Sequence, residues 1–250
     1  MSKHSEACCK IPPVVVEGYE PKGKYIDLNG TKTYVTGPES ADTAILSLYD
    51  IFGFFPQTIQ GADILAYSDS AHPYQVFMPD FFAGNPADVS WYPPDSDEKK
   101  EKFTKWLEEN AAPPKHLPKV PTLLEAAEKT NSNIKSWGVI GYCWGGKMAS
   151  LIASKDGKIK AAVQTSPAMV DPAEASNVKI PMMMLASKEE PADTVKQYDE
   201  NLKVTKHVET FGDQLHGFMS ARADLKDEKV KSEYERGYKL ALQFFHDNIH

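Results

Sequence analysis

The stretch KSWGVIGYCWGGKMASLIAS, residues 135–154, decides the fold. Its apolar run over 135–140 predicts a buried central strand, and a helix is expected over about 146–154. Between them lies a G-x-C-x-G turn, residues 141–145, which presents Cys143 from a sharp strand-to-helix connection. Glycines are needed there because side chains would strike the neighbouring strand and helix. The turn predicts a nucleophile at a helix N-terminus, where free N–H groups and the helix dipole favour a thiolate.

Chance is a weak explanation for this pattern. The chain holds 15 glycines and 3 cysteines among 250 residues, so an accidental G-x-C-x-G match is expected only about 0.01 times. The alternative interpretation is that Cys143 is a buried structural cysteine in a tight turn.

The rest of the chain alternates short apolar runs with amphipathic segments, which is typical of an α/β fold. An antiparallel ribbon is expected at the start, because Asn29-Gly30 is a strong hairpin turn. With the G-x-C-x-G turn, this pattern predicts an α/β-hydrolase fold, with a mostly parallel central sheet and helices on both faces. Strands are expected over 24–28, 32–36, 43–48, 74–78, 135–140, 160–164, 181–186 and 205–210, and helices over about 56–68, 97–109, 146–154 and 228–248.

The length suits one α/β-hydrolase domain over residues 1–250. Residues 85–121 differ in character, because they are rich in proline and charge and contain Trp91, Tyr92 and Trp106. Such an excursion often forms a cap over a site, although a plain surface insertion remains open.

Composition excludes several classes of protein. A net charge of -7 argues against nucleic-acid or anionic-membrane partners, and no stretch approaches the ~20 apolar residues of a membrane span. Three cysteines are too few for a disulfide framework, so we expect a reducing, cytoplasmic setting. Adjacent Cys8 and Cys9 indicate a frayed or docked N-terminal segment better than a redox pair or metal ligands. No metal and no cofactor are expected.

A histidine and an acid are expected to complete the site. His216 lies in a loop just past the last expected strand, where this fold places its base, although a surface-loop histidine is the alternative. The acid should follow the strand that ends near residue 186, where Glu189, Glu190 and Asp193 compete. Such an acid fixes the tautomer of the imidazole and stabilises the imidazolium.

Several motifs together resemble the dienelactone hydrolase (carboxymethylenebutenolidase-like) family. The resemblance covers most of the chain, and the cysteine turn is its most specific mark, since most α/β hydrolases carry serine there. Two further stretches resemble the fungal branch of the family. The family motifs are the turn at 141–146, His216-Gly217-Phe218, Asp50-Ile51-Phe52-Gly53 and the loop at 78–84, and the fungal ones are Cys8-Cys9 and the stretch at 34–38.

The resemblance implies roles for further residues. Backbone N–H groups of Ile51 and Trp144 would form an oxyanion hole. Glu190 is favoured as the acid, because a proline after the acid is common in this loop among similar proteins. The family has a glutamate at the position of Asp50, where it helps to take the thiol proton, and the aspartate here is one methylene shorter.

The resemblance also bears on substrate recognition. Family members that act on dienelactone hold its carboxylate with arginines, and the matching positions here are Gly84 and Ser220, with Arg222 two residues further on. Phe52 and Phe218, together with Trp144, flank the expected site and would make it apolar. Anionic dienelactone is therefore a doubtful substrate.

The leading hypothesis is a hydrolase of lactones or small activated esters, acting on a small-molecule substrate through Cys143, His216 and a carboxylate. Isomerisation or cyclisation of a carbonyl compound at the same site is the first alternative. A non-catalytic stress or binding protein on the same fold is the second. A monomer or homodimer is expected.

Overall fold

The computed structural model describes residues 17–69 and 72–249, so Cys8 and Cys9 lie outside the described residues. Its strands are β1 (Lys24–Leu28), β2 (Thr31–Thr36), β3 (Thr43–Leu48), β4 (Tyr74–Pro79), β5 (Ser136–Tyr142), β6 (Ile159–Thr165), β7 (Met182–Ser187) and β8 (Lys206–Phe211). Its helices are α1 (Pro56–Tyr67), α2 (Asp97–Asn110), α3 (Pro113–His116), α4 (Lys119–Thr130), α5 (Trp144–Ala153), α6 (Pro172–Ala175), α7 (Ala192–Asn201) and α8 (Glu228–Asn248), with a 3-10 turn η2 (Val89–Trp91).

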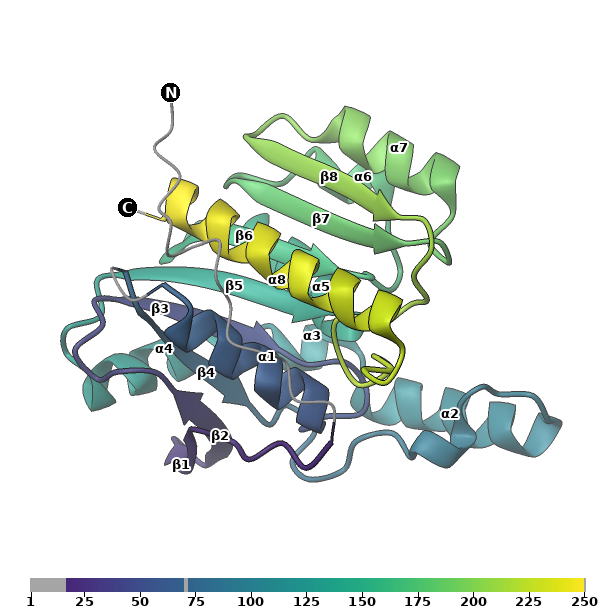
Figure 1. Ribbon diagram of the computed structural model, residues 1–250, viewed down its shortest axis with the longest axis horizontal. Coiled ribbons are helices and arrows are strands. Elements are labelled where there is room, and N and C mark those ends of the chain that lie inside the picture. Colours follow the sequence, from purple (N-terminus) through teal and green to yellow (C-terminus); the bar gives the residue numbers. More distant parts are fainter. Residues whose placement is uncertain (1–16, 70–71, 250) are drawn as a thin grey trace.

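One sheet holds the eight strands of the described chain, in the order β1-β2-β4-β3-β5-β6-β7-β8 (Figure 1). The β1-β2 and β2-β4 pairs are antiparallel, and every other pair is parallel. The Asn29-Gly30 turn closes the first hairpin, with both residues at positive φ. The expected α/β-hydrolase fold is confirmed.

The chain changes direction across the sheet next to β3. It runs from β3 to β4 on one side and later enters β5 on the other, so β3 pairs with both strands in parallel. Ligands of such sheets bind beyond the carboxyl ends of the strands at the point where the strand order reverses. Here that point lies between the ends of β3 and β5, where Leu48 is paired with Gly141.

Helices cover both faces of the sheet. In Figure 1, α1 and α8 lie in front of it, while α4, α5 and α6 lie behind. The front layer is tight, because a Cβ atom on Gly61 of α1 would lie 1.8 Å from the Tyr238 hydroxyl of α8. That hydroxyl is fixed in turn by hydrogen bonds to Tyr142 and to the Met219 carbonyl, both 2.9 Å long.

Some element boundaries differ from the expected ones. Helix α5 begins at Trp144, two residues earlier than expected, because Cys143 is its N-cap. Helix α4 was not expected, although Val120, Leu123 and Leu124 are buried at helical spacing. Its Pro121 lies in the first turn, where proline is tolerated, so the proline-rich sequence there does not stop a helix. Helix α7, which follows Pro191, was also not expected.

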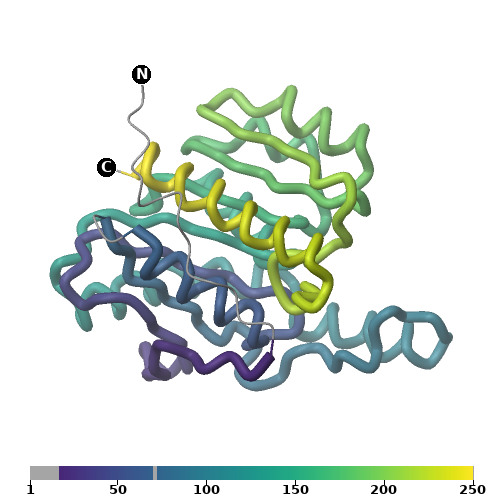
Figure 2. Tube along the Cα trace, in the orientation of Figure 1, coloured from purple at the N-terminus to yellow at the C-terminus, as the bar shows by residue number. Residues whose placement is uncertain are grey.

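Residues 85–121 hold η2, α2 and α3 and end in the first turn of α4. Helix α2 extends away from the sheet in both views (Figures 1 and 2). The division of the chain into a single domain with a cap stays a prediction. Within the described ranges, no helix has the length and apolar character needed to cross a membrane.

Gly61→Ala tests the contact between α1 and α8. Alanine normally favours a helix by about 1 kcal/mol over glycine. Here the methyl group meets the Tyr238 ring, so we expect the free energy of unfolding to fall by about 1–3 kcal/mol. The matched control is Gly157→Ala, where a Cβ atom would have no neighbour within 4 Å. Equal stability of both variants in denaturant unfolding would contradict the packing described here.

Candidate active site

Cys143 occupies a strained turn between β5 and α5. Its backbone has φ 52° and ψ -110°, a region that a residue with a side chain seldom adopts. Two glycines allow the turn: a Cβ atom on Gly141 would lie 1.9 Å from the Gly145 carbonyl oxygen, and one on Gly145 would lie 2.0 Å from the Leu48 carbonyl oxygen. Both obstacles are backbone atoms, so no side chain can be accommodated at either position.

The thiol of Cys143 is free and partly exposed. It sits at the start of α5, where the first N–H groups of the helix stabilise negative charge. The Cys143 N–H donates to the Thr165 carbonyl at 3.0 Å, which ties the turn to the neighbouring strand β6. The surrounding backbone therefore fixes where the sulfur points.

The imidazole of His216 joins Cys143 to a buried carboxylate. Its Nδ1 lies 2.6 Å from Glu190 Oε1, and the Glu190 side chain is only 4% exposed. The other oxygen of Glu190 accepts the N–H of Ser187 in a short hydrogen bond. Burial opposes protonation of His216, but hydrogen bonds to Cys143 and Glu190 outweigh it and raise the pKa of the imidazole to about 10.

The three competing carboxylates have different surroundings. Glu189 Oε2 accepts the backbone N–H of His216 at 3.1 Å and so contacts the main chain of His216, whereas the ring of His216 donates to Glu190. Asp193 is exposed in the first turn of α7. Of the three, Glu190 has the burial and the bond that the expected acid requires.

Asp50 ties two loops of the site together. Its Oδ1 accepts the Phe52 N–H at 2.9 Å, and its Oδ2 accepts the Ala221 N–H at 3.1 Å. Burial raises the pKa of the carboxyl, while hydrogen bonds from Ser220, Phe52 and Ala221 and the charge of His216 counteract that rise. The carboxylate is thus engaged by the backbone that follows His216, and it holds that loop beside the loop after β3.

A cavity of about 400 Å³ opens above the cysteine turn. Asp50, Ile51 and Phe52 line it from the loop after β3, and Cys143 and Trp144 line it from the cysteine turn. His216 and Arg222 close another side. The predicted nucleophile, base and oxyanion-hole residues are therefore brought to one cavity.

The excursion at 85–121 supplies much of the remaining wall. Tyr92, Phe103 and Leu107 line the cavity, together with Met169 from the loop after β6. The Trp144 indole donates to the Ala111 carbonyl at 2.6 Å and so fixes the end of the excursion to the first residue of α5. Phe103, Leu107 and Met169 were not expected at the site, since nothing in the sequence shows which side of an irregular segment faces a cavity.

Phe218 is not where we expected it. It lies outside the lining of the cavity, and its ring, which is 1% exposed, packs at 4.7 Å from Phe211 in the core. The prediction failed because adjacent loop residues, such as Gly217 and Phe218, face in different directions.

The positions that match the family's arginines do not line the cavity. Gly84 is exposed, and Ser220 is fully buried with its hydroxyl donating to the Gly217 carbonyl at 3.4 Å. Arg222 does reach the cavity, but it donates to the His216 carbonyl at 2.8 Å and stacks on the Tyr92 ring at 4.8 Å. Glu189 lies 3.5 Å from the same guanidinium and balances its charge.

Comparison with known proteins identifies related chains. The dienelactone hydrolase family matches residues 31–249. An uncharacterized AIM2 family protein of Schizosaccharomyces pombe is 31% identical over 233 residues, covering 91% of this chain and 92% of the relative. A carboxymethylenebutenolidase homolog of Xenopus tropicalis is 30% identical over 240 residues, covering 92% and 93%. The solved dienelactone hydrolase of Anabaena variabilis shares the fold, with a TM-score of 0.65 at 13% identity over 92% of this chain and 99% of that one.

Glu190→Gln separates the competing acids. Without the carboxylate that stabilises the imidazolium, the pKa of His216 should fall, and turnover should drop by about 10⁴-fold because the wrong tautomer is favoured. The matched control, Asp193→Asn, should change neither quantity. Histidine NMR titration and steady-state kinetics provide the two readouts. A large loss in Asp193→Asn with none in Glu190→Gln would reverse the assignment.

Proposed function

The chain belongs to the dienelactone hydrolase family and is a hydrolase, and we propose that it opens lactones or small activated esters with Cys143 as the nucleophile. One observation carries the proposal. The free thiol at the strained turn lines the same cavity as His216 and helps to raise the pKa of its imidazole, whose Nδ1 is bonded to buried Glu190. Nucleophile, base and orienting acid are thus arranged in series.

The first half of the reaction forms a thioester. His216 takes the proton of the Cys143 thiol, the sulfur attacks the carbonyl carbon, and the carbonyl electron pair moves onto oxygen beside the N–H groups of Ile51 and Trp144. Collapse of this intermediate breaks the bond to the leaving oxygen, which takes a proton from the His216 imidazolium. In a lactone the leaving alcohol stays attached to the same molecule.

The second half of the reaction releases the acid. Neutral His216 takes a proton from water, and the resulting hydroxide attacks the thioester carbon. The bond to sulfur breaks, so Cys143 returns as a thiolate beside the imidazolium, and the carboxylic acid releases its proton to solvent and leaves as a carboxylate. Glu190 stays ionised throughout and stabilises the imidazolium in both halves.

The cavity favours neutral, apolar substrates. Aromatic and aliphatic side chains form most of its wall, including Phe52, Phe103 and Leu107. The guanidinium of Arg222 reaches it, but this group is already bound to the His216 carbonyl and faces Glu189. A substrate carboxylate would have to compete with these partners.

The excursion at 85–121 acts as a cap in this proposal. Its residues cover the cavity from one side. They are anchored to the start of α5 by the hydrogen bond from the Trp144 indole to the Ala111 carbonyl. Exclusion of water strengthens every electrostatic contact beneath the cap and protects the thioester until the product alcohol departs.

A cytoplasmic setting belongs to the same proposal. The nucleophile works only as a free thiol, and a reducing compartment keeps an accessible cysteine in that state.

Substrate charge provides one test. We compare esters or lactones that carry either a neutral substituent or a carboxylate of similar shape. The neutral substrate should have the higher kcat/KM, by about ten- to a hundredfold, because the carboxylate lacks one charge-assisted arginine contact of that value. Arg222→Gln should leave this ratio nearly unchanged. A preference for the anionic analogue that disappears in Arg222→Gln would show instead that this guanidinium holds a substrate carboxylate.

Substitution of the nucleophile tests the reaction itself. Cys143→Ala should abolish turnover while changing Tm little, because a small side chain is lost from an open cleft. Cys143→Ser should also be severely impaired, since an alcohol is far less acidic than a thiol and the imidazole of His216 would have to remove a much more tightly held proton. Full activity of Cys143→Ala on a good substrate would rule out the proposed mechanism.

Hydrolysis is separated from isomerisation by mass analysis of the product. Reaction in H₂¹⁸O should place one labelled oxygen in the carboxylate, because water attacks the thioester carbon. Complete conversion without any label would indicate isomerisation or cyclisation at the same residues.

A further inference from the structure

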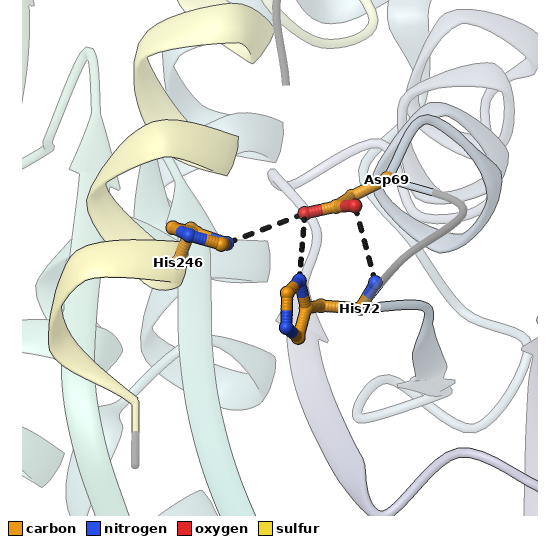
Figure 3. Close-up of side chains that lie close together, drawn as sticks. All are labelled: Asp69, His72 and His246. Carbon is orange, nitrogen blue, oxygen red and sulfur yellow. Dashed lines mark hydrogen bonds and ion pairs between the residues drawn. The ribbon is translucent and has the colours of Figure 1, made fainter. Parts of the chain in front are cut away.

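Three potential metal ligands meet far from the cavity. Asp69 follows α1, His72 precedes β4, and His246 lies near the end of α8 (Figure 3). One ligand atom from each lies within 4.8 Å of the other two. Asp69 and His72 are neighbours in the sequence, and the fold brings the distant His246 to them.

This cluster is separate from the candidate active site. Cys143 follows the carboxyl end of β5, whereas His72 lies two residues before the first residue of β4, at the amino ends of the parallel strands. Helix α1 spans the sheet between these two edges. An ion bound at the cluster would therefore act on the fold and not on the reacting carbonyl.

The separations between ligand atoms suit a small metal ion. Asp69 Oδ2 lies 3.3 Å from His246 Nδ1 and 3.7 Å from His72 Nδ1. Around a tetrahedral zinc with ligand bonds of about 2.0–2.2 Å, neighbouring ligand atoms are about 3.3–3.6 Å apart. The two separations from Asp69 are close to this range, and the two imidazoles, whose ligand atoms lie within 4.8 Å of each other, would move closer together around one ion.

The carboxylate is held in position by the chain. Asp69 Oδ1 accepts the backbone N–H of His72 at 3.1 Å, which leaves Oδ2 directed towards the two imidazoles. Hydrogen bonds of this kind orient a ligand before the metal binds.

Burial and exposure also fit an ion site. The Asp69 side chain is 0% exposed, so its charge is taken out of water and gains from a cation beside it. His246 is 22% exposed and His72 is 63% exposed, which leaves the site open on one side. That side gives an ion a path of entry and leaves room for water as the fourth ligand.

We propose that Asp69, His72 and His246 bind one divalent transition-metal ion of the zinc type. Two imidazole nitrogens select such ions over Mg²⁺ or Ca²⁺, which prefer oxygen ligands. The bound ion links the segment after α1 to helix α8. Helices α1 and α8 pack against each other on one face of the sheet. The ion stabilises the closing helix and leaves the chemistry at Cys143 unchanged.

Cobalt and zinc are the probes. The experiment uses untagged full-length protein from which a chelator has removed any metal. The protein carries Cys143→Ala, so the thiol of the active site cannot bind the added ion. In a titration with Co²⁺, we expect each chain to bind one ion and to show a ligand-field spectrum. No thiolate-to-metal charge-transfer band should appear, and this result would exclude Cys8 and Cys9 as ligands of the ion. Zn²⁺ at about a hundredfold excess over Kd should raise Tm by about 5–10 °C.

Single substitutions in the same background locate the ion. His246→Ala and His72→Ala should each weaken Co²⁺ binding by at least about tenfold and abolish most of the zinc-dependent rise in Tm. His72 is largely exposed, so its variant should fold even if His246→Ala does not. The matched control is His207→Ala, because His207 forms a partly exposed pair with Glu209 at 3.2 Å and no third ligand joins them among the residues that the structure describes.

The outcomes divide clearly. Stoichiometric binding that depends on His72 and His246 but not on His207 supports the proposal. Absence of stoichiometric binding, a thiolate spectrum, or equal affinity in all three variants overturns it.

Discussion

The close approach of α5 to the end of β3 is the constraint on which the site depends. Gly145 lies against the carbonyl of Leu48 so closely that a single Cβ atom would clash with the backbone. This contact allows the chain to leave β5 through a turn with Cys143 at positive φ, and it places the start of α5 beside the loop that carries Asp50 and Ile51. Strain in the turn is balanced by a sheet whose central strands are buried on both faces.

Two buried carboxylates organise the loops around that turn. Asp50 accepts N–H groups from both of the loops that flank the cavity, and Glu190 holds His216 while it accepts the N–H of Ser187. Each acid is buried, and each is satisfied by backbone donors or by the imidazole, so the cost of desolvation is offset by hydrogen bonds to the charged group. The imidazole is thereby held between a carboxylate and a thiol.

The sequence predicted most where a local pattern has a single structural solution. The G-x-C-x-G turn and the hairpin at Asn29-Gly30 are of this kind, and the structure has both. Prediction failed where the direction in which a side chain points depends on contacts with residues that are distant in the sequence. Phe218 turned into the core, while Phe103 and Met169 reached the cavity. Helix α4 was overlooked because proline near its start was taken for loop sequence. The group of Asp69, His72 and His246 has no local signature, since only the packing of α8 assembles it.

A covalent intermediate on Cys143 tests the central claim most directly. The protein is mixed with an activated neutral ester, quenched in acid within milliseconds to seconds, digested and analysed by mass spectrometry. The account predicts that the peptide containing Cys143 gains the mass of the acyl group, and that this species decays at the rate of steady-state turnover. Turnover at full rate with Cys143 unmodified at every quench time, or with the acyl group on another residue, would contradict it.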